Sequence, residues 1–274
     1  MKIAFVGGGT MAEAILGGIL ENKIANARDI TAGEIIADRR AYLAKKYGIS
    51  ALASNAAAVE KAEMVILAVK PQNLHEVFDQ LKGKLKPKQA VVSIVAGAGM
   101  KALERGFGHK GIIRVMPNTP AQIGAGMSVW TAAPSVDKAK VEVTRSILRT
   151  LGEEVYVVDE KYIDMATSLS ASGPAYVFLF IESLIDAGVY LGMPRDMART
   201  LVLQTVLGST QLVRKSGKHP AELRDMVTSP GGTTAEALFE LEDGGFRATI
   251  LSAVASAYEK AQLLGGLGTE DEEE

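Results

Sequence analysis

Gly7, Gly9 and Ala12 are spaced so that the backbone is left bare between an apolar run and an amphipathic segment. Gly7 permits a tight turn out of the strand expected at Ile3–Val6, and Gly9 has no Cβ to hold a pyrophosphate away. Ala12 lets the next helix pack closely on the strand, and the positive N-terminus of that helix attracts phosphate. This G-x-G-x-x-A pattern between a strand and a helix predicts a dinucleotide site. The alternative is a tight turn that binds no ligand.

Charged side chains after the second apolar run bear on which dinucleotide fits. Glu34 comes directly after the strand expected at Ile30–Gly33. A carboxylate there can accept hydrogen bonds from the ribose hydroxyls and repels a 2′-phosphate, which favours NADH. Arg39 and Arg40 follow about one helical turn later, where either can reach a phosphate; otherwise they are solvated helix charges. The cofactor is therefore NADPH or NADH, with a lean to NADH.

Three further segments end apolar runs on the same expected edge of a sheet. In Ala68–Pro71, the proline forces Lys70 into an extended conformation at the edge where ligands bind in such folds. Its ammonium is expected near the pyrophosphate or a substrate carboxylate. The small residues and prolines of Val95–Gly99 and Met116–Pro120 suit a rigid wall beside a flat nicotinamide, although each is also an ordinary turn sequence.

A second anion site is expected in the segment Thr228–Leu238. Gly231 and Gly232 leave successive N–H groups bare at a positive helix end, which suits a carboxylate. The hydroxyl of Thr234 lies beside that pocket in the sequence. Thr233 also has capping-box spacing to a glutamate, so a well-capped helix start is the alternative. Capping alone does not require a preceding Ser-Pro-Gly-Gly.

Alternating apolar and amphipathic segments must position the residues of the expected dinucleotide site. Strands are expected at Ile3–Val6, Ile30–Gly33, Met64–Val69, Ala90–Val95, Ile112–Met116, Met127–Thr131 and Glu154–Val158. Helices are expected at Met11–Asn22, Ala37–Tyr47, Leu74–Leu81, Met100–Arg105 and Val136–Leu151. This alternation predicts an α/β Rossmann-type, doubly wound and mainly parallel sheet over residues 1–158, forming a dinucleotide-binding domain.

Residues 159–268 contain no convincing strand and predict an all-α C-terminal domain. Helices are expected at Tyr162–Leu169, Pro174–Leu191, Arg195–Ser216, Ala221–Val227 and Thr233–Leu264. The Pro174–Leu191 helix is apolar nearly all round, so a partner subunit is expected to cover it. Gly188 and Gly208 indicate either close helix packing or simple tolerance. The acidic run at 269–274 is expected to be a disordered tail.

The bulk composition narrows the class of protein. The chain has 274 residues, 47% of them hydrophobic, and a net charge of -2, which gives no support for nucleic-acid or membrane binding. It has no cysteine and three scattered histidines, so no metal site is expected. Glu182 and Asp186 argue against membrane insertion of the apolar helix, and solvent or an arginine such as Arg195 or Arg199 is expected to satisfy them. These features predict a cytoplasmic globular protein.

Taken together, these motifs resemble the pyrroline-5-carboxylate reductase family. The resemblance runs nearly from end to end, and the Ser-Pro-Gly-Gly segment is the family signature. It is carried by Phe5–Gly9, Ala68–Pro71, Met116–Pro120, Leu169–Tyr176, Ser229–Thr234 and Glu242–Arg247. It implies reduction of the cyclic imine 1-pyrroline-5-carboxylate to L-proline by NADPH or NADH, the final step of proline biosynthesis. It also implies a homodimer that assembles further, commonly into a decamer.

The resemblance assigns roles to particular residues. It implies dinucleotide binding by Val6, Gly7, Gly8, Gly9, Thr10, Met11, Glu34, Asn55, Ala68, Val69, Lys70, Pro71 and Ala96. It places Glu160, Ser229, Gly231, Gly232, Thr233 and Thr234 at the substrate, with Thr234 as the catalytic residue. Some relatives have a serine suited to a 2′-phosphate in place of Glu34 and an alanine in place of Thr233.

Two other functions compete with imine reduction. A 3-hydroxyacid dehydrogenase of the same two-domain plan needs a general base, typically a lysine, on the first long helix of its second domain. The Pro174–Leu191 helix has neither lysine nor histidine, which counts against that function. A non-catalytic redox sensor would bind the dinucleotide without turning over the imine.

Overall fold

The computed structural model describes residues 1–266, which form two compact units. The tail expected at 269–274 lies outside the described residues. The first unit comprises Met1–Ser172 together with the end of the last helix from Ala257, and the second comprises Gly173–Ser256.

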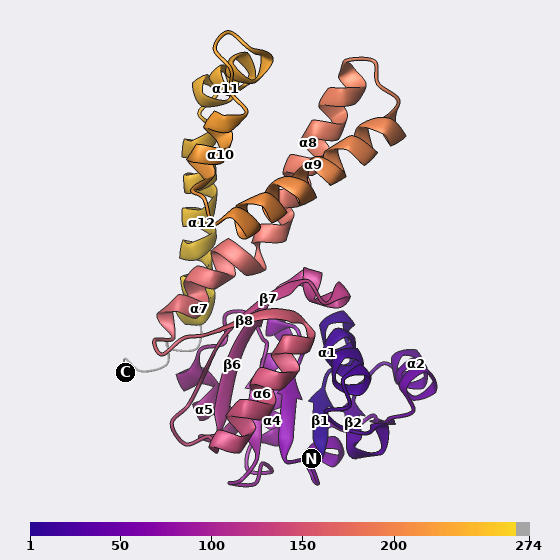
Figure 1. The fold of residues 1–274 in the computed structure, drawn as a ribbon. Coiled ribbons are helices and arrows are strands. Elements are labelled where there is room, and N and C mark those ends of the chain that lie inside the picture. Colours follow the sequence, from indigo (N-terminus) through magenta and orange to yellow (C-terminus); the bar gives the residue numbers. More distant parts are fainter. Residues whose placement is uncertain (267–274) are drawn as a thin grey trace. The chain divides into compact units, whose positions relative to one another are not determined.

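The first unit is built on an eight-stranded sheet with the order β3-β2-β1-β4-β5-β6-β7-β8 (Figure 1). All neighbouring strands are parallel except β6 and β7, which are antiparallel. The strands are β1 (Ile3–Val6), β2 (Ile30–Gly33), β3 (Ser50–Leu52), β4 (Met64–Leu67), β5 (Ala90–Ser93), β6 (Ile112–Pro117), β7 (Gly126–Ala132) and β8 (Gly152–Tyr156). The expected doubly wound, mainly parallel sheet is confirmed.

Helices cover both faces of this sheet. They are α1 (Thr10–Glu21), α2 (Ala37–Tyr47), α3 (Asn55–Val59), α4 (Leu74–Leu81), α5 (Met100–Phe107) and α6 (Lys138–Thr150). Short 3₁₀ turns lie at Ala27–Asp29, Pro71–Asn73 and Thr119–Ile123. The sequence analysis missed β3 and α3, because segments of three and five residues are too short to show a period.

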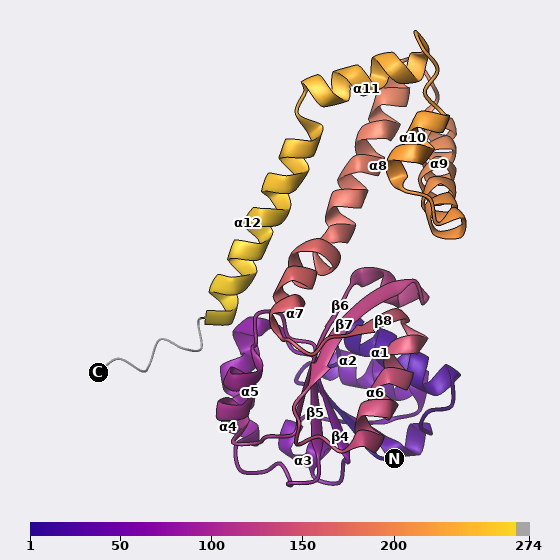
Figure 2. The same ribbon diagram turned by 60° about the vertical axis from the view of Figure 1, so that its left-hand side comes forward.

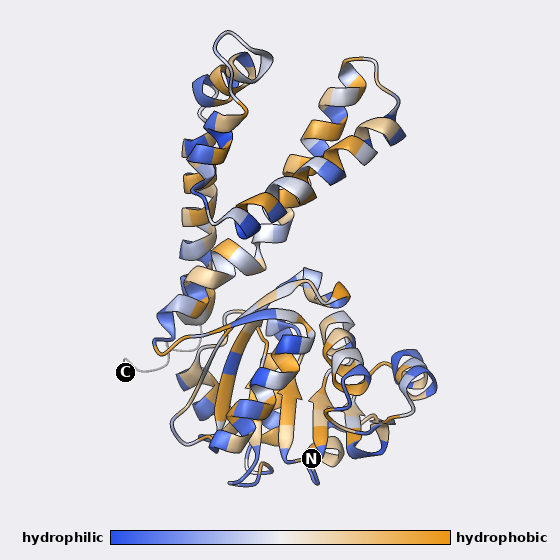
Figure 3. Cartoon of the chain, viewed as in Figure 1, coloured by the Kyte–Doolittle hydropathy of each residue, from blue (hydrophilic) through white to orange (hydrophobic). Residues whose placement is uncertain are grey.

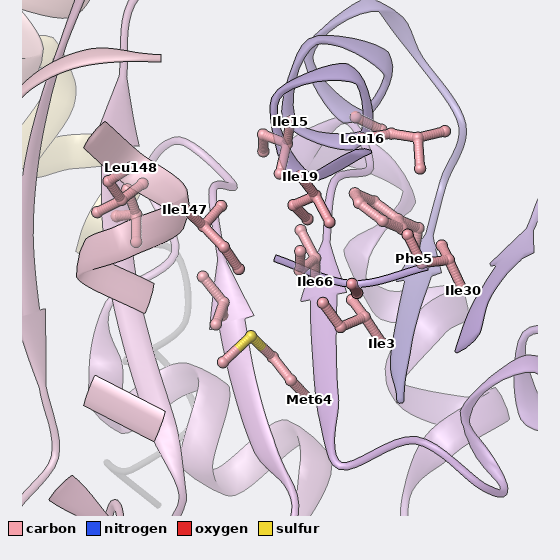
Figure 4. Close-up of a cluster of buried hydrophobic side chains, with 14 of the residues drawn as sticks. Ile3, Phe5, Ile15, Leu16, Ile19, Ile30, Met64, Ile66, Ile147 and Leu148 are labelled. Carbon is pink, nitrogen blue, oxygen red and sulfur yellow. The ribbon is translucent and has the colours of Figure 1, made fainter. Parts of the chain in front are cut away.

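Alternation along β1 divides the core into two layers. Ile3 and Phe5 join a cluster with residues of α1, α2 and α6, whereas Ala4 and Val6 join one with residues of α3, α4 and α5. Figure 4 shows part of the first cluster, and Figure 3 shows the hydrophobic residues along the strands. A strand buried on both faces must be apolar throughout, and all four β1 residues are 1% exposed or less. Because these strands are buried, the carboxyl ends of the strands, where the expected site residues lie, are held in fixed positions.

A buried ion-pair network extends the first unit past the domain boundary expected at residue 158. On β6, Arg114 has a side chain only 2% exposed, and its Nη1 and Nη2 each lie 2.6 Å from a carboxylate oxygen, of Glu160 and Asp164 respectively. Glu160 is the N-cap of α7 (Lys161–Ala166) and Asp164 lies within that helix, and the π-helical turn Thr167–Ala171 follows. Ile163 packs with Met116 and Val129 of the sheet, so the compact unit ends at Ser172.

The second unit is entirely helical over its described length. It contains α8 (Gly173–Tyr190), α9 (Arg195–Ser216), α10 (Pro220–Met226), α11 (Thr233–Asp243) and the first part of α12 (Phe246–Gly266). The single helix expected over Thr233–Leu264 is wrong: it breaks at Gly244 and Gly245, the latter with φ of 70°. A left-handed glycine ends a helix readily, and Figure 2 shows the resulting bend between α11 and α12.

Packing between α8 and α9 shows that Gly188 and Gly208, for which close packing and simple tolerance were both considered, differ. A Cβ on Gly188 would lie 2.9 Å from the Ala198 Cβ, so close helix approach is confirmed there. Gly208 has only Gln204 at 4.0 Å, so a side chain would be tolerated. Asp186 is paired with Arg195 at 2.9 Å, as expected.

Apolar side chains of α8 remain uncovered in the single chain. Phe178 and Leu179 are 61% and 64% exposed, and Figure 3 shows hydrophobic residues along α8 and α9. The stretch Lys161–Tyr190 is long and apolar enough to cross a membrane by its length and composition alone, a property that core helices of soluble proteins share. Exposure on this scale marks an interaction surface.

Arg114→Met tests the ion-pair network. Removal of the buried guanidinium leaves two carboxylates close together without a counter-charge, so the free energy of unfolding should fall by about 3 kcal/mol in urea titrations. The matched control is Arg149→Met, which removes an exposed guanidinium from Glu154, a carboxylate that keeps Arg145 as a partner, and should cost less than about 1 kcal/mol. Equal losses in the two variants would contradict the structural role of Arg114.

Candidate functional site

The glycine turn after β1 has the geometry of a phosphate cradle. Gly7 has φ of 92°, its N–H donates to the Gly33 carbonyl at 2.8 Å, and a Cβ there would lie 2.6 Å from the Ala68 oxygen. Only glycine fits such a position. Gly9 is the N-cap of α1, and a Cβ built on it meets nothing within 4 Å. The backbone there is open at a positive helix end.

The expected dinucleotide residues meet around this turn. The Ala68 N–H donates to the Val6 carbonyl at 2.9 Å, which joins the ends of β4 and β1. Val6 is fully buried, and Thr10 and Met11 open α1. Lys70 is exposed with φ of -69° and ψ of 148°, so the extended conformation expected before Pro71 is confirmed. The carboxyl ends of β1, β2 and β4 therefore supply one continuous edge.

Glu34 lies against the glycine turn. One carboxylate oxygen accepts a hydrogen bond from the Gly8 N–H at 2.8 Å, and the other accepts one from the Ile36 N–H at 2.8 Å. The residue is 9% exposed, whereas Ile35 and Ile36 beside it are 68% and 60% exposed. These isoleucines, which sequence reasoning missed, present an apolar surface next to the carboxylate that would read the ribose.

Arg39 and Arg40 are both engaged with backbone carbonyls. The Nε of Arg39 donates to the Gly8 oxygen at 2.5 Å, and its Nη2 lies 2.5 Å from a carboxylate oxygen of Glu13. The Nη1 of Arg40 donates to the Glu34 and Ile35 oxygens at 2.8 Å each. Neither arginine is simply a solvated helix charge.

A polar cluster around Glu13 joins α1 to α2, and sequence reasoning missed it. The second carboxylate oxygen of Glu13 accepts hydrogen bonds at 2.8 Å from each of Tyr42, Lys46 and Tyr47. Burial alone would raise the pKa of this carboxyl, but the bonds from Lys46, Arg39 and the tyrosines outweigh burial and lower the pKa to about 2. Glu13 is therefore ionised at neutral pH. The sequence signal is an acidic residue in the first turn of a helix that follows a glycine turn.

Asn55 tests whether a dinucleotide suits these residues. The side chain is 6% exposed, and its Nδ2 donates to Gln80 at 2.8 Å. Its buried Oδ1 has no hydrogen-bond partner among the described residues and lies beside Gly33. A buried acceptor without a donor is costly, and a bound hydroxyl would satisfy it. The open Gly9 and the orphaned Asn55 oxygen both fit a nucleotide.

The loop after β5 provides a wall on the same edge. Ala96 packs with the Met116, Val129 and Ile163 cluster, and Gly97 has φ of 73°. A cavity of about 400 Å³ lies beside this loop and is lined by Pro71, His75, Phe78, Ala96, Gly97 and Leu264, among others. It is mostly apolar, which suits a flat ring.

Glu160 is held by partners within the first unit. Its Oε1 lies 2.6 Å from Arg114 and accepts a hydrogen bond from the Met100 N–H at 2.7 Å. Met100 opens α5, directly after the loop that carries Ala96. The carboxylate therefore caps α5 and anchors that loop. Its substrate role stays a prediction.

The second glycine cradle opens α11. Gly232 is the N-cap, and α11 starts without a side-chain capping bond, so the capping box considered for Thr233 does not form. Gly231 has φ of 67°, and the Gly232 N–H donates to the Ser229 oxygen at 3.0 Å. Within the described chain, the N–H groups of Gly231, Thr233 and Thr234 donate to no other backbone group. They remain available to an anion.

No group of three or more histidine, aspartate or glutamate side chains that could hold a metal ion occurs among the described residues.

Comparison with known proteins matches both halves of the chain. Residues 160–264 match the family model for pyrroline-5-carboxylate reductase dimerisation, and residues 2–97 match that for NADP oxidoreductase, coenzyme F420-dependent. The pyrroline-5-carboxylate reductase of Synechocystis sp. is 42% identical over 265 residues, covering 97% of this chain and 98% of the relative. That of Escherichia coli is 40% identical over 264 residues, covering 96% and 98%.

Solved structures agree with this match. The crystal structure of Plasmodium falciparum pyrroline carboxylate reductase with NADP bound has a TM-score of 0.88 and 34% identity, and covers 97% of this chain and 98% of that chain. A pyrroline-5-carboxylate reductase from Coxiella burnetii has a TM-score of 0.84 and 34% identity, with 96% and 98% covered.

Gly7→Ala tests the phosphate cradle. The new Cβ would meet the Ala68 oxygen in a left-handed conformation, so unfolding free energy should fall by about 2 kcal/mol and dinucleotide affinity should drop. Calorimetric titration with NADH and urea unfolding measure the two effects. Gly17→Ala, at a half-buried position of α1 where the added Cβ meets nothing within 4 Å, should leave binding unchanged. Normal affinity in Gly7→Ala would disprove the cradle.

Proposed function

The chain belongs to the pyrroline-5-carboxylate reductase family, and from this premise we propose how its residues reduce the imine. The reaction is the NAD(P)H-dependent conversion of 1-pyrroline-5-carboxylate to L-proline, the final step of proline biosynthesis. The observation that carries this function is about 40% identity to such reductases over nearly the whole chain. Membership of this family excludes the alternatives of a 3-hydroxyacid dehydrogenase and a non-catalytic redox sensor.

The cofactor is a nicotinamide dinucleotide, and we propose that the enzyme prefers NADH. Glu34 supports this preference, because its buried carboxylate lies next to the Gly8 N–H, where it would accept from ribose hydroxyls and repel a 2′-phosphate. Gly7, Gly8 and Gly9 would hold the pyrophosphate, and the exposed faces of Ile35 and Ile36 would cover the adenine. Asn55 would accept a hydrogen bond from the nucleotide through its orphaned oxygen.

The substrate carboxylate is proposed to bind on the second glycine cradle. The free N–H groups of Gly231, Thr233 and Thr234 would donate to it, with Gly232 and Ser229 shaping the turn. A carboxylate at a helix N-terminus is stabilised by the helix dipole as well as by these hydrogen bonds. The half-buried hydroxyl of Thr234 would then lie beside the ring nitrogen.

The chain's own part in the chemistry is mainly positioning. When bound, the reduced nicotinamide supplies a hydride to the imine carbon. The electron pair of the C=N bond moves to nitrogen, which becomes the amine of L-proline once it carries a proton. A cyclic imine is basic enough to arrive protonated, so no strong general acid is required of the protein. Thr234 would orient the nitrogen through its hydroxyl, and the N–H cradle would fix the carboxylate.

The C-terminal half is a dimerisation domain, and the exposed apolar side chains of α8 are suited to that role. We propose a homodimer that assembles further, such as a decamer, in the cytoplasm. We also propose that Glu160 contacts the substrate, in addition to its contacts with Arg114 and Met100.

An assay with the purified protein tests the proposed reaction and cofactor. Oxidation of NADH and of NADPH is followed separately with 1-pyrroline-5-carboxylate, and proline is identified as the product. Because Glu34 repels a 2′-phosphate, kcat/KM for NADH should exceed that for NADPH by about tenfold, the effect of one unfavourable charge contact. Higher efficiency with NADPH would refute the preference, and the absence of proline would refute the reaction.

Thr234→Ala tests the catalytic assignment. Loss of one oriented donor should lower kcat by roughly ten- to a thousandfold, while KM for the dinucleotide stays unchanged. Thr234→Ser, which keeps the hydroxyl, should restore most of the rate. Thr233→Ala is the matched control, because it keeps the backbone N–H and should turn over normally. An unchanged kcat in Thr234→Ala would dismiss the assigned role.

A further inference from the structure

Glu13 and Arg39 meet on the backbone of the glycine turn. The Arg39 guanidinium donates through Nε to the Gly8 oxygen at 2.5 Å and through Nη2 to the Gly9 oxygen at 3.4 Å. The same Nη2 lies 2.5 Å from Glu13. Among the described residues, Nη1 has no partner. The guanidinium also lies over the Tyr42 ring, 4.9 Å from its centroid.

The position of Arg39 places it at the nucleotide. Gly8 donates its N–H to Glu34 and accepts from Arg39 through its carbonyl, so a carboxylate and a guanidinium both contact the backbone of this one residue. Glu34 is the residue expected to read the ribose. NADPH carries a phosphate at the 2′ position of this ribose, and NADH carries a hydroxyl there. A cation next to that position attracts the phosphate and has little effect on the hydroxyl.

Glu13 offsets the charge of Arg39 and orders its side chain. Its carboxylate accepts four hydrogen bonds, from Arg39, Tyr42, Lys46 and Tyr47, and is 18% exposed. Its depressed pKa keeps it ionised at neutral pH. Arg40 differs, because its bonds go to neutral carbonyls and leave its charge uncompensated.

We propose that Glu13 is a positioning residue that restrains and neutralises Arg39, and thereby sets how strongly the site discriminates against a ribose 2′-phosphate. The inference rests on the proposed function, since it concerns the dinucleotide. The physical basis is that the negative charge of Glu13 repels a negatively charged 2′-phosphate and offsets the attraction by Arg39. Removal of one negative charge beside Arg39 favours a 2′-phosphate dianion and has little effect on a neutral 2′-hydroxyl.

Calorimetric titration of the intact protein with adenosine 2′,5′-bisphosphate and with adenosine 5′-monophosphate tests this directly. The affinity ratio of the two nucleotides should rise about tenfold in Glu13→Gln, the scale of one nearby charge at a partly exposed site. Arg39→Gln should lower the ratio by a similar factor, because it leaves the Glu13 carboxylate with one counter-charge fewer. In Glu13→Gln/Arg39→Gln the gain should vanish, which a purely structural role for Glu13 would not produce.

Glu21→Gln is the matched control, since it removes the same charge from the last residue of the same helix and should leave the ratio unchanged. An unchanged ratio in Glu13→Gln, or a gain that persists in the double variant, overturns the proposal. If neither nucleotide binds the wild-type protein, the proposed cofactor fails instead, so the two failures are distinguishable. Urea unfolding of each variant verifies that the fold is retained.

Discussion

The backbone of Gly8 carries the interactions on which the nucleotide edge depends. Its N–H is fixed by Glu34 and its carbonyl by Arg39, while the preceding glycine is pressed against the Ala68 oxygen in a left-handed conformation. A side chain at Gly7 would displace the ends of β1 and β4. The close packing therefore explains both the requirement for glycine and the convergence of charged groups from α1, β2 and α2 on a few backbone atoms.

Local sequence patterns predicted the elements that surround this turn. The strands Ile3–Val6 and Ile30–Gly33 and the helices Ala37–Tyr47 and Leu74–Leu81 have the bounds that the sequence analysis expected. Their apolar runs or helical periods were long enough to be unambiguous. The short β3 and α3 were missed because pairing with β2 and a Ser54 cap, not periodicity, define them. The break between α11 and α12 depends on two glycines within an otherwise periodic stretch.

Long-range polar contacts could not be predicted in the same way. Glu13 is separated by 26 residues from Arg39, and Arg114 by 46 from Glu160, and nothing in the local pattern marks these pairs. The family resemblance named the residues that are expected to contact ligands, but not the side chains that hold those residues in place. Asn55 illustrates the difference: its role was implied by resemblance, while its buried, unsatisfied oxygen supplies an independent physical reason for a bound hydroxyl.

The contact between Leu264 and Gly97 joins parts of the chain that are synthesised far apart in time. A Cβ on Gly97 would lie 2.8 Å from the Leu264 Cβ, so the loop after β5 is packed against nearly the last described side chain. Ribosomal synthesis delivers β5 long before Leu264. The nascent sheet must therefore keep this loop without its final neighbour, and the wall beside the expected nicotinamide position is completed only once the C-terminal helix has been released from the exit tunnel.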